Sequence, residues 1–245
     1  MMPRSSVDYA TDQITVYRMC PYSCRYCYVW KNKLFSYRVK AGKYDPVEEA
    51  RKYTRRKDRV IVVSFVSDPY PPFEREKRLT RRVLEALCST DNRVMVLTKN
   101  PLLALELDIK LFHSCGFWLG TTVITLDHYK SRYWEPKVLD PWARLLSLYF
   151  AKKWYGVRTW LSIEPIIPYT TYPEEIVGET LDYIDYYVLG SFNYARQLGY
   201  SKYGSRELEK WYHKYIVRAI EILKQQGKPF FIKKELKKYL KVIKE

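Results

Sequence analysis

The sequence predicts an α/β protein in which six strand-and-helix units form an open or partial parallel barrel. Apolar, β-branched runs recur along the chain, and longer helical patterns separate them. This alternation predicts parallel strands joined by right-handed crossover connections. Six units fall short of the eight in a closed barrel of this kind. At 245 residues, 47% of them hydrophobic, the chain suits one globular core, so we expect a single domain over residues 1–245.

The expected strands are short and rich in β-branched and aromatic residues. They are Gln13–Tyr17, Arg59–Phe65, Arg93–Leu97, Trp118–Val123, Arg158–Ile163 and Tyr186–Leu189. Helical patterns follow them at Pro46–Arg56, Glu76–Leu87, Leu102–His113, Pro141–Trp154, Pro173–Leu181 and Ser205–Gln226. Residues 228–245 form a C-terminal extension, in which we expect a short seventh strand at Lys228–Ile232 and a basic helix at Lys233–Ile243.

The chain is strongly basic: Lys and Arg number 43 against 27 Asp and Glu, a formal net charge of +16. Such an excess attracts polyanions and favours nucleic acid as a partner. A Lys-rich thermophile surface is the alternative explanation, and the presence of only four Asn and four Gln suits a hot environment. No apolar run reaches membrane-spanning length, and the N-terminus lacks the apolar core of a signal peptide. We therefore expect a cytoplasmic protein without a membrane partner, whose five cysteines are ligands or buried thiols rather than disulfides.

Polar residues follow the predicted strands at the ends where parallel α/β proteins bind ligands. A cysteine-rich segment follows the first strand, and other polar residues come at or near the ends of the next four. These are Ser67 and Asp68, Thr98 and Lys99, Thr121 and Thr122, and Ser162. The pattern predicts one ligand-binding mouth at this edge of the sheet.

The cysteine-rich segment carries Cys20, Cys24 and Cys27 within eight residues. Three thiolates on one loop can bind an iron–sulfur cluster of four irons. One iron then stays open for a substrate or cofactor, as at catalytic metals generally. A structural zinc site is the alternative, but it needs four protein ligands, and the chain offers no second pair of closely spaced cysteines.

The spacing Cys-x3-Cys-x2-Cys, with the aromatic Tyr26 before the last cysteine, resembles the radical SAM superfamily. The resemblance covers nearly the whole chain and implies a partial (βα)6 barrel. It also implies a [4Fe–4S] cluster that cleaves S-adenosylmethionine (SAM) reductively, forming a 5′-deoxyadenosyl radical that abstracts hydrogen from a substrate. A reductant protein such as flavodoxin or ferredoxin would supply the electron.

A second set of motifs is similar to the radical SAM group often labelled DNA repair photolyases, whose characterised relative is spore photoproduct lyase. The most specific segment begins at Ser67-Asp68-Pro69-Tyr70 and continues to Glu76. Further matches are Leu79–Arg82, Leu97–Lys99, Glu135-Pro136 with Arg144, Trp160–Pro165 and Phe231–Lys233. The resemblance leaves open whether the enzyme is a lyase or a transferase, and whether it repairs DNA or modifies RNA.

The resemblance assigns several residues to SAM. Ser67 would contact the SAM amine or carboxylate, and Lys99 would pair with the carboxylate. Thr121 or Thr122 would reach the ribose hydroxyls. Asp68 would either accept from the amine or cap its own loop, and these alternatives stay open. Ser162 and Tyr26 are also expected in the cofactor site.

Two departures from the group bear on the reaction. Spore photoproduct lyase uses a cysteine, two residues before its matching serine, as a hydrogen-atom donor. Here that position is Phe65, which has no S–H bond, so repair of the spore thymine dimer is not expected. Cys88 and Cys115 are expected to be buried small hydrophobes rather than radical relays.

The substrate clue in the sequence is basic residues interleaved with aromatics, because cations neutralise phosphates and aromatic faces stack on unpaired bases. Such segments occur at residues 51–57, 149–155 and 194–203, and Lys233-Lys234 and Lys237-Lys238 add a basic helix. Nucleic acid is therefore the expected substrate. A small-molecule or peptide substrate is one alternative, and a non-catalytic nucleic-acid-binding protein with a cluster or zinc is another.

Overall fold

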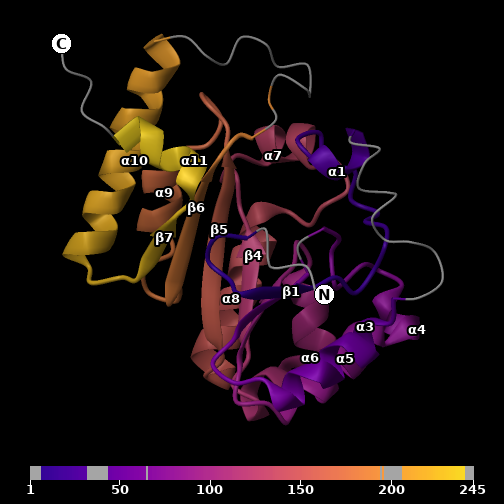
Figure 1. Ribbon diagram of the computed structural model, residues 1–245. Coiled ribbons are helices and arrows are strands. Elements are labelled where there is room, and N and C mark those ends of the chain that lie inside the picture. The colour runs from indigo at the N-terminus through magenta and orange to yellow at the C-terminus, as the bar shows by residue number, and fades with distance from the viewer. Residues whose placement is uncertain (1–6, 32–43, 65, 194, 196–205, 241–245) are drawn as a thin grey trace.

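The computed structural model describes residues 7–31, 44–64, 66–193, 195 and 206–240 (Figure 1). Seven strands form one sheet in the order β1 to β7, and every neighbouring pair is parallel. The strands are Asp12–Ile14, Val60–Val63, Arg93–Leu97, Trp118–Thr122, Arg158–Ile166, Tyr186–Ser191 and Phe230–Ile232. The sheet curls into a half-barrel, so the predicted α/β partial barrel is confirmed, including the short seventh strand.

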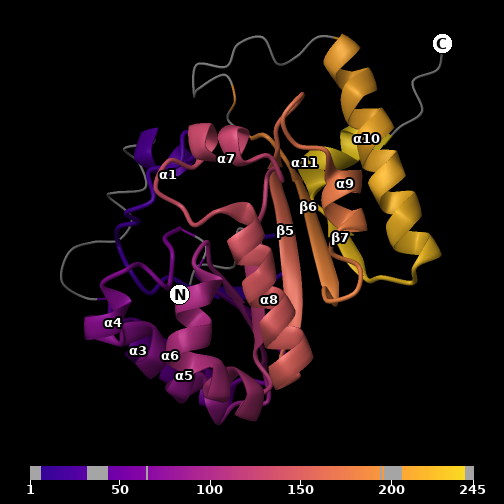
Figure 2. The same ribbon diagram turned by 180° about the vertical axis from the view of Figure 1, so that it is seen from behind.

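Helices cover the outer face of the curled sheet (Figures 1 and 2). The longer ones are α3 (Pro46–Arg51), α5 (Leu79–Cys88), α6 (Pro101–Ser114), α8 (Pro141–Tyr155), α9 (Pro173–Gly178) and α10 (Arg206–Gln225). Short helices are α1 (Tyr28–Lys31), α4 (Glu74–Lys77), α7 (His128–Trp134) and α11 (Lys234–Lys237), with 3-10 turns at Lys52–Arg55 and Lys238–Leu240. No helix in these ranges is long and apolar enough to cross a membrane.

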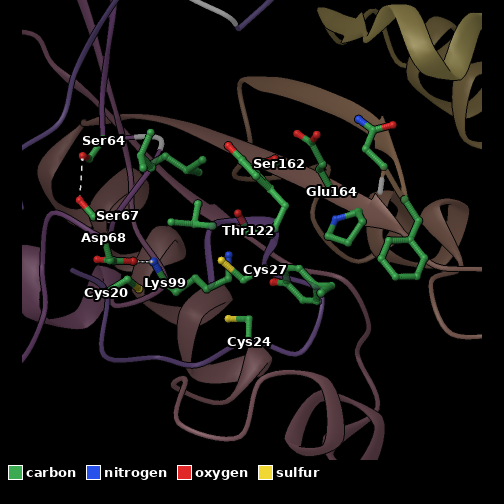
Figure 3. Close-up of a pocket in the computed structure, with 18 of the residues that line it drawn as sticks. Cys20, Cys24, Cys27, Ser64, Ser67, Asp68, Lys99, Thr122, Ser162 and Glu164 are labelled. Atoms are coloured by element: carbon green, nitrogen blue, oxygen red, sulfur yellow. Dashed lines mark hydrogen bonds between the residues drawn. The ribbon is translucent and has the colours of Figure 1, made fainter. Parts of the chain in front are cut away.

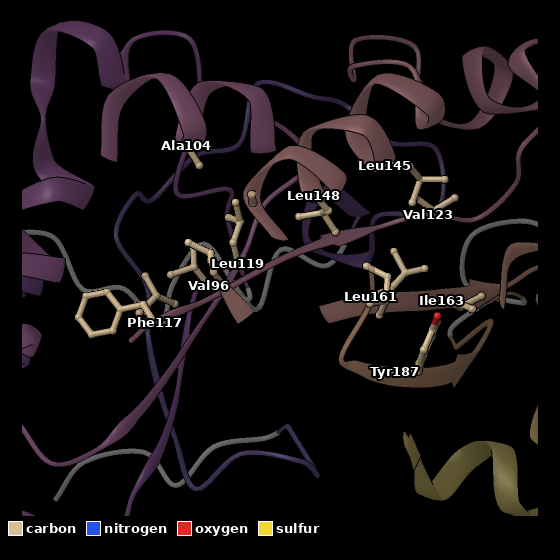
Figure 4. Packing of buried hydrophobic residues seen from close by; sticks show 14 of the residues in the cluster. Val96, Ala104, Phe117, Leu119, Val123, Leu145, Leu148, Leu161, Ile163 and Tyr187 are labelled. Atoms are coloured by element: carbon tan, nitrogen blue, oxygen red, sulfur yellow. The ribbon is translucent and has the colours of Figure 1, made fainter. Parts of the chain in front are cut away.

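The main core lies between the sheet and these helices. Val96 and Leu119 point from the sheet toward Ala104 of α6 and Leu148 of α8 (Figure 4). Each is no more than 2% exposed, as expected for aliphatic residues that alternate along a strand with inward-facing ones.

The inner face of the half-barrel carries a second cluster, centred on the fully buried Trp160. Its indole Nε1 donates to the Val96 carbonyl over 3.1 Å. A Cβ on Gly120 would lie 2.3 Å from the same nitrogen, so a glycine in the neighbouring strand makes room for the indole. This cluster fills the lower part of the barrel, leaving the carboxyl ends of the strands for a ligand.

Some helices differ from the sequence prediction. The helix expected at Glu76–Leu87 is divided because Arg78 adopts a left-handed backbone conformation, with φ 50°. Helix α7 was not predicted; it begins where the Asp127 carboxylate accepts a hydrogen bond from the Lys130 amide, at 3.0 Å. The basic C-terminal helix is shorter than expected in its described part, and its last residues lie outside the described chain.

Cys88 and Cys115 form a disulfide, so the expectation of two buried thiols was wrong. The helices α5 and α6 end side by side, and the two Cα atoms are 5.2 Å apart, within the usual range for a disulfide. A separation of 27 residues along the chain does not reveal this contact. The pairing leaves the other three cysteines free.

Candidate functional site

A cavity of about 280 Å³ opens at the carboxyl ends of the strands (Figure 3). The loop after β1 supplies cysteines to its wall, and the loops after β2 and β3 supply Ser67, Asp68 and Lys99. Strands β4 and β5 contribute Thr122 and Ser162. The structure therefore brings together the polar strand ends that the sequence marks as one mouth.

Cys20, Cys24 and Cys27 all line this cavity as free, half-buried thiols (Figure 3). Burial raises the pKa of Cys20 to about 11 and that of Cys24 to about 12. Near neutral pH these two thiols are therefore protonated, and a metal that binds them as thiolates must displace the protons.

The cysteine loop is held in place by its own neighbours. The Tyr22 hydroxyl donates to the Tyr70 carbonyl over 2.9 Å. Arg25 donates from its backbone amide to the Trp134 carbonyl at 2.8 Å and from Nε to the Tyr133 carbonyl at 2.6 Å. The loop is thus docked on α7 and on the loop after β2, which fixes the direction in which the thiols point.

Asp68 organises two of the loops that carry the site. Its carboxylate accepts from the Tyr70 amide at 2.9 Å, from the Thr98 hydroxyl at 2.7 Å and from the Lys99 amide at 2.7 Å. Burial raises the pKa of this carboxyl, and these hydrogen bonds oppose the rise. The contacts give Asp68 the capping role, although its side chain also reaches the cavity wall. Ser67 lies beside it, with its hydroxyl 3.4 Å from that of Ser64.

Lys99 belongs to a buried charged cluster that also contains Tyr26, Glu135 and Arg144. The Lys99 ammonium lies 3.9 Å from Glu135 and 5.6 Å from the centre of the Tyr26 ring. Burial works against the charge of Lys99, but the Cys24 and Glu135 side chains outweigh it and raise the lysine pKa. Glu135 accepts from Arg144 at 2.6 Å and from the Tyr26 hydroxyl, and the Glu135 and Arg144 side chains have no exposed surface. The lysine is therefore held charged at the edge of the cavity.

The two threonines of β4 face opposite sides of the sheet. Thr122 lines the cavity together with Ser162 of the next strand. Thr121 does not line it; its side chain is fully buried, and its hydroxyl donates to the Thr98 carbonyl at 2.6 Å. Of the two threonines, Thr122 is therefore the one that lines the cavity.

The far wall of the cavity carries an ion pair to which sequence analysis assigned no role. The Lys233 ammonium lies 2.7 Å from the Glu164 carboxylate, and both residues line the cavity. A Cβ on Gly190 would come within 2.6 Å of the Glu164 side chain, so the carboxylate occupies space that only glycine leaves free. Both residues fell within the resembling segments, and that was the signal that could have identified them.

The donor set suits a polynuclear iron–sulfur cluster better than a single metal ion. Within the described ranges, no group of three His, Cys, Asp or Glu side chains is arranged to hold one metal ion. In a cubane each cysteine binds a different iron, so the thiols need only surround one space. Three free thiols on the wall of one cavity meet that requirement, and a cubane bound by them would keep a fourth iron without a cysteine ligand.

Solved structures with the same fold include spore photoproduct lyase in complex with dinucleoside spore photoproduct, which is 14% identical with a TM-score of 0.65. The match covers 95% of this chain and 78% of that one. SuiB of Streptococcus suis bound to S-adenosylmethionine is 13% identical with a TM-score of 0.59, over 90% of this chain and 50% of that one. These likenesses show that the chain shares the fold of both proteins, and its three cysteines lie at the mouth of that fold.

At the sequence level, the chain belongs to the same family as the uncharacterised protein MJ0683 of Methanocaldococcus jannaschii. The two are 31% identical over 192 residues, which cover 74% of this chain and 70% of that protein. The uncharacterised protein ORF301 of Acidianus two-tailed virus is 24% identical over 172 residues, 64% of this chain and 56% of that protein. No family model matches the chain.

Proposed function

We propose that this protein cleaves SAM reductively and uses the resulting radical to abstract hydrogen from a nucleic-acid substrate. The observation that carries the first part is the cavity in which three free thiols face Lys99, Thr122 and Ser162. When bound, a reduced [4Fe–4S] cluster supplies the electron that splits the SAM sulfonium into methionine and a 5′-deoxyadenosyl radical.

Four side chains on the cavity wall have the charged roles in this proposal. Cys20, Cys24 and Cys27 would hold the cluster beside the space in which SAM would bind. Lys99 balances the charge of the SAM carboxylate. The side chains around it, Glu135 among them, keep its ammonium charged, and it lines the cavity.

The neutral hydroxyls complete the SAM site in this proposal. Ser67, Thr122 and Ser162 supply groups that both donate and accept, which suits an amine and a ribose diol. Asp68 acts through Lys99, whose backbone amide it holds, rather than by contacting SAM. These neutral contacts orient the cofactor without adding charge to the cavity.

The nucleic-acid part of the proposal is supported by the net charge of +16. Not every basic segment can serve this purpose. Arg55 and Arg56 come just before β2, and Trp154 and Tyr155 just before β5, so both segments lie at the amino end of the sheet, opposite the cavity. Residues 196–205, which hold most of a third segment, lie outside the described chain, as does Phe65. The argument from Phe65 against thymine-dimer repair stays a prediction.

Anaerobic reconstitution tests the enzymatic part of the proposal. The protein reconstituted with iron and sulfide should bind about four irons per chain, the content of a cubane cluster, and release 5′-deoxyadenosine from SAM when dithionite is added. Changing Cys24 to Ala should remove both the iron and the cleavage. The matched control replaces Cys88 and Cys115 with Ala, which removes two sulfurs outside the cavity and should leave both properties intact.

Two results would overturn this proposal. Cleavage that survives in Cys24→Ala would show that the cluster assignment is wrong. If the reconstituted wild-type protein binds iron but yields no 5′-deoxyadenosine, the protein is a non-catalytic cluster-binding protein and the proposed cleavage is wrong.

A further inference from the structure

Three tyrosines on the rim of the barrel mouth are exposed and take no part in the cavity. Tyr129 and Tyr133 lie on α7 and are 84% and 52% exposed; Tyr169 lies in the loop after β5 and is 53% exposed. Helix α7 and this loop both lie at the mouth end of the barrel in the two views (Figures 1 and 2). Large aromatic surface in contact with water, bordered by charged groups, marks an interaction site more often than a structural one.

Two cations contact two of these tyrosines, and we call the three tyrosines together with Arg25 and Lys130 the tyrosine ridge. Arg25 of the cysteine loop lies 4.5 Å from the centre of the Tyr133 ring. Tyr129 and Tyr133 are four residues apart and therefore share one face of α7. Lys130 donates from its ammonium to the Tyr169 carbonyl at 3.4 Å. The ridge thus runs from the cluster-binding loop along α7 to the loop after β5.

Tyr169 has an unusual backbone conformation, and its ring packs against a neighbour. Its φ is 61°, in the left-handed region that a bulky residue seldom adopts, and such conformations gather at functional sites. The ring also lies against Trp211, with the two ring centres 5.7 Å apart. The contact with Trp211 therefore supports the partly exposed Tyr169 ring, while the Lys130 ammonium lies at the Tyr169 carbonyl and 5.6 Å from the centre of the Tyr172 ring.

The charge around the ridge is mostly positive. Besides its two cations, Arg132 and Lys137 are exposed on α7 and just after it. Around α7, Asp127 caps the helix, Asp140 pairs with His128 at 2.6 Å, and Glu135 is buried, while Glu174 and Glu175 in the first turn of α9 are the acidic groups near the Tyr169 end. Aromatic faces alternating with cations suit a strand of phosphates with unpaired bases, because the rings stack on the bases and the cations neutralise the phosphates.

We propose that the tyrosine ridge binds single-stranded nucleic acid and leads it to the cavity. Unpaired bases stack on Tyr129, Tyr133 and Tyr169, while Arg25 and Lys130 contact phosphates. The inference rests on the proposed nucleic-acid substrate and extends it, since it names the binding surface and the single-stranded form. A strand bound here can place one base in the cavity without opening a duplex, which lowers the cost of reaching the radical.

Fluorescence anisotropy with a labelled single-stranded oligonucleotide tests the ridge on the reconstituted, full-length protein. Tyr169→Ala should weaken binding about tenfold, and Tyr129→Ala with Tyr133→Ala should weaken it further, since each loses a stacking face. Tyr169→Phe should bind like the wild type, because the face remains. The matched control is Trp154→Ala, which removes a ring that is 70% exposed at the opposite end of the barrel and should leave affinity unchanged. Lys130→Gln should reduce the salt dependence of binding by about one phosphate contact.

SAM cleavage, measured on the same variants without oligonucleotide, separates this inference from the proposed function. Normal cleavage with weakened binding supports the ridge. If the wild type binds the oligonucleotide and the ridge variants bind equally well, the ridge is wrong and the proposed function stands. Equal affinity for duplex DNA, or displacement of the strand by an acidic peptide at equal concentration, also overturns the ridge. A wild type that binds no oligonucleotide at low salt overturns both the ridge and the nucleic-acid substrate, but not SAM cleavage.

Discussion

Replacing Glu135 with Gln removes one charge from an ion pair, Glu135 with Arg144, whose side chains have no exposed surface. Arg144 then loses the negative charge of its 2.6 Å partner and keeps the Thr122 carbonyl at 2.5 Å, while its Nε already lacks a hydrogen-bond partner within the described ranges. Removing one member of a buried ion pair costs about 3–5 kcal/mol. Because Gln retains one acceptor oxygen, we expect Glu135→Gln to lower the free energy of unfolding by about 3 kcal/mol. In a chain of this length that corresponds to a melting temperature lower by roughly 6–12 °C.

We expect replacement of Arg144 to lower the free energy of unfolding less than replacement of Glu135 does. In Arg144→Met, Glu135 keeps the Tyr26 hydroxyl and the Lys99 ammonium, so this variant should lose less, about 2 kcal/mol. The double variant should be more stable than Glu135→Gln alone, because no unpaired guanidinium remains. Urea unfolding followed by tryptophan fluorescence measures all three variants. If the two single effects add to within about 0.5 kcal/mol in the double variant, the ion pair does not act as described.

Three further variants probe the rest of the site and fold. Lys99→Met should weaken SAM binding at least about tenfold in calorimetry, whereas Thr121→Val, which faces away from the cavity, should retain it; equal losses would contradict the assignment. Gly190→Ala should lower the free energy of unfolding by about 1–3 kcal/mol because its Cβ displaces the Glu164 side chain, and unchanged stability would contradict the packing. Cys88→Ser opens a disulfide across 27 residues and should cost about 3.5 kcal/mol in urea unfolding, a difference that reduction of the wild type should abolish.

Much of the fold could be predicted because its signals are local. Strands such as Arg93–Leu97 are short apolar runs, and the helices between them repeat the 3.6-residue period, so both follow from neighbouring residues. The short helix α7 escaped prediction because seven residues contain too few turns to show a period. The helix expected at Glu76–Leu87 is divided at Arg78, whose conformation no propensity of the sequence predicts.

Part of the site could be predicted because its signals, like those of the strands and helices, are local in the sequence. The polar residues at the strand ends meet in one cavity because parallel strands all end at the same edge. The side of the sheet that each residue faces depends on register, since a shift by one residue exchanges the faces. That is why the choice between Thr121 and Thr122 needed the structure. The roles of Glu135 and Glu164 could not be derived either, because a single acidic residue carries no local sign of its partner.

The sequence by itself determined the cysteine loop, the alternation of strands and helices along the chain and the excess of positive charge, because each is a property of adjacent residues or of composition. Only the tertiary structure decided which distant residues meet. Tyr26 contacts Glu135 across 109 positions, and Lys233 contacts Glu164 across 69. It also paired Cys88 with Cys115 and placed the tyrosine ridge beside the cysteine loop. Such contacts arise from the packing of helices and loops on the curled sheet, and the spacing of residues along the chain does not encode them.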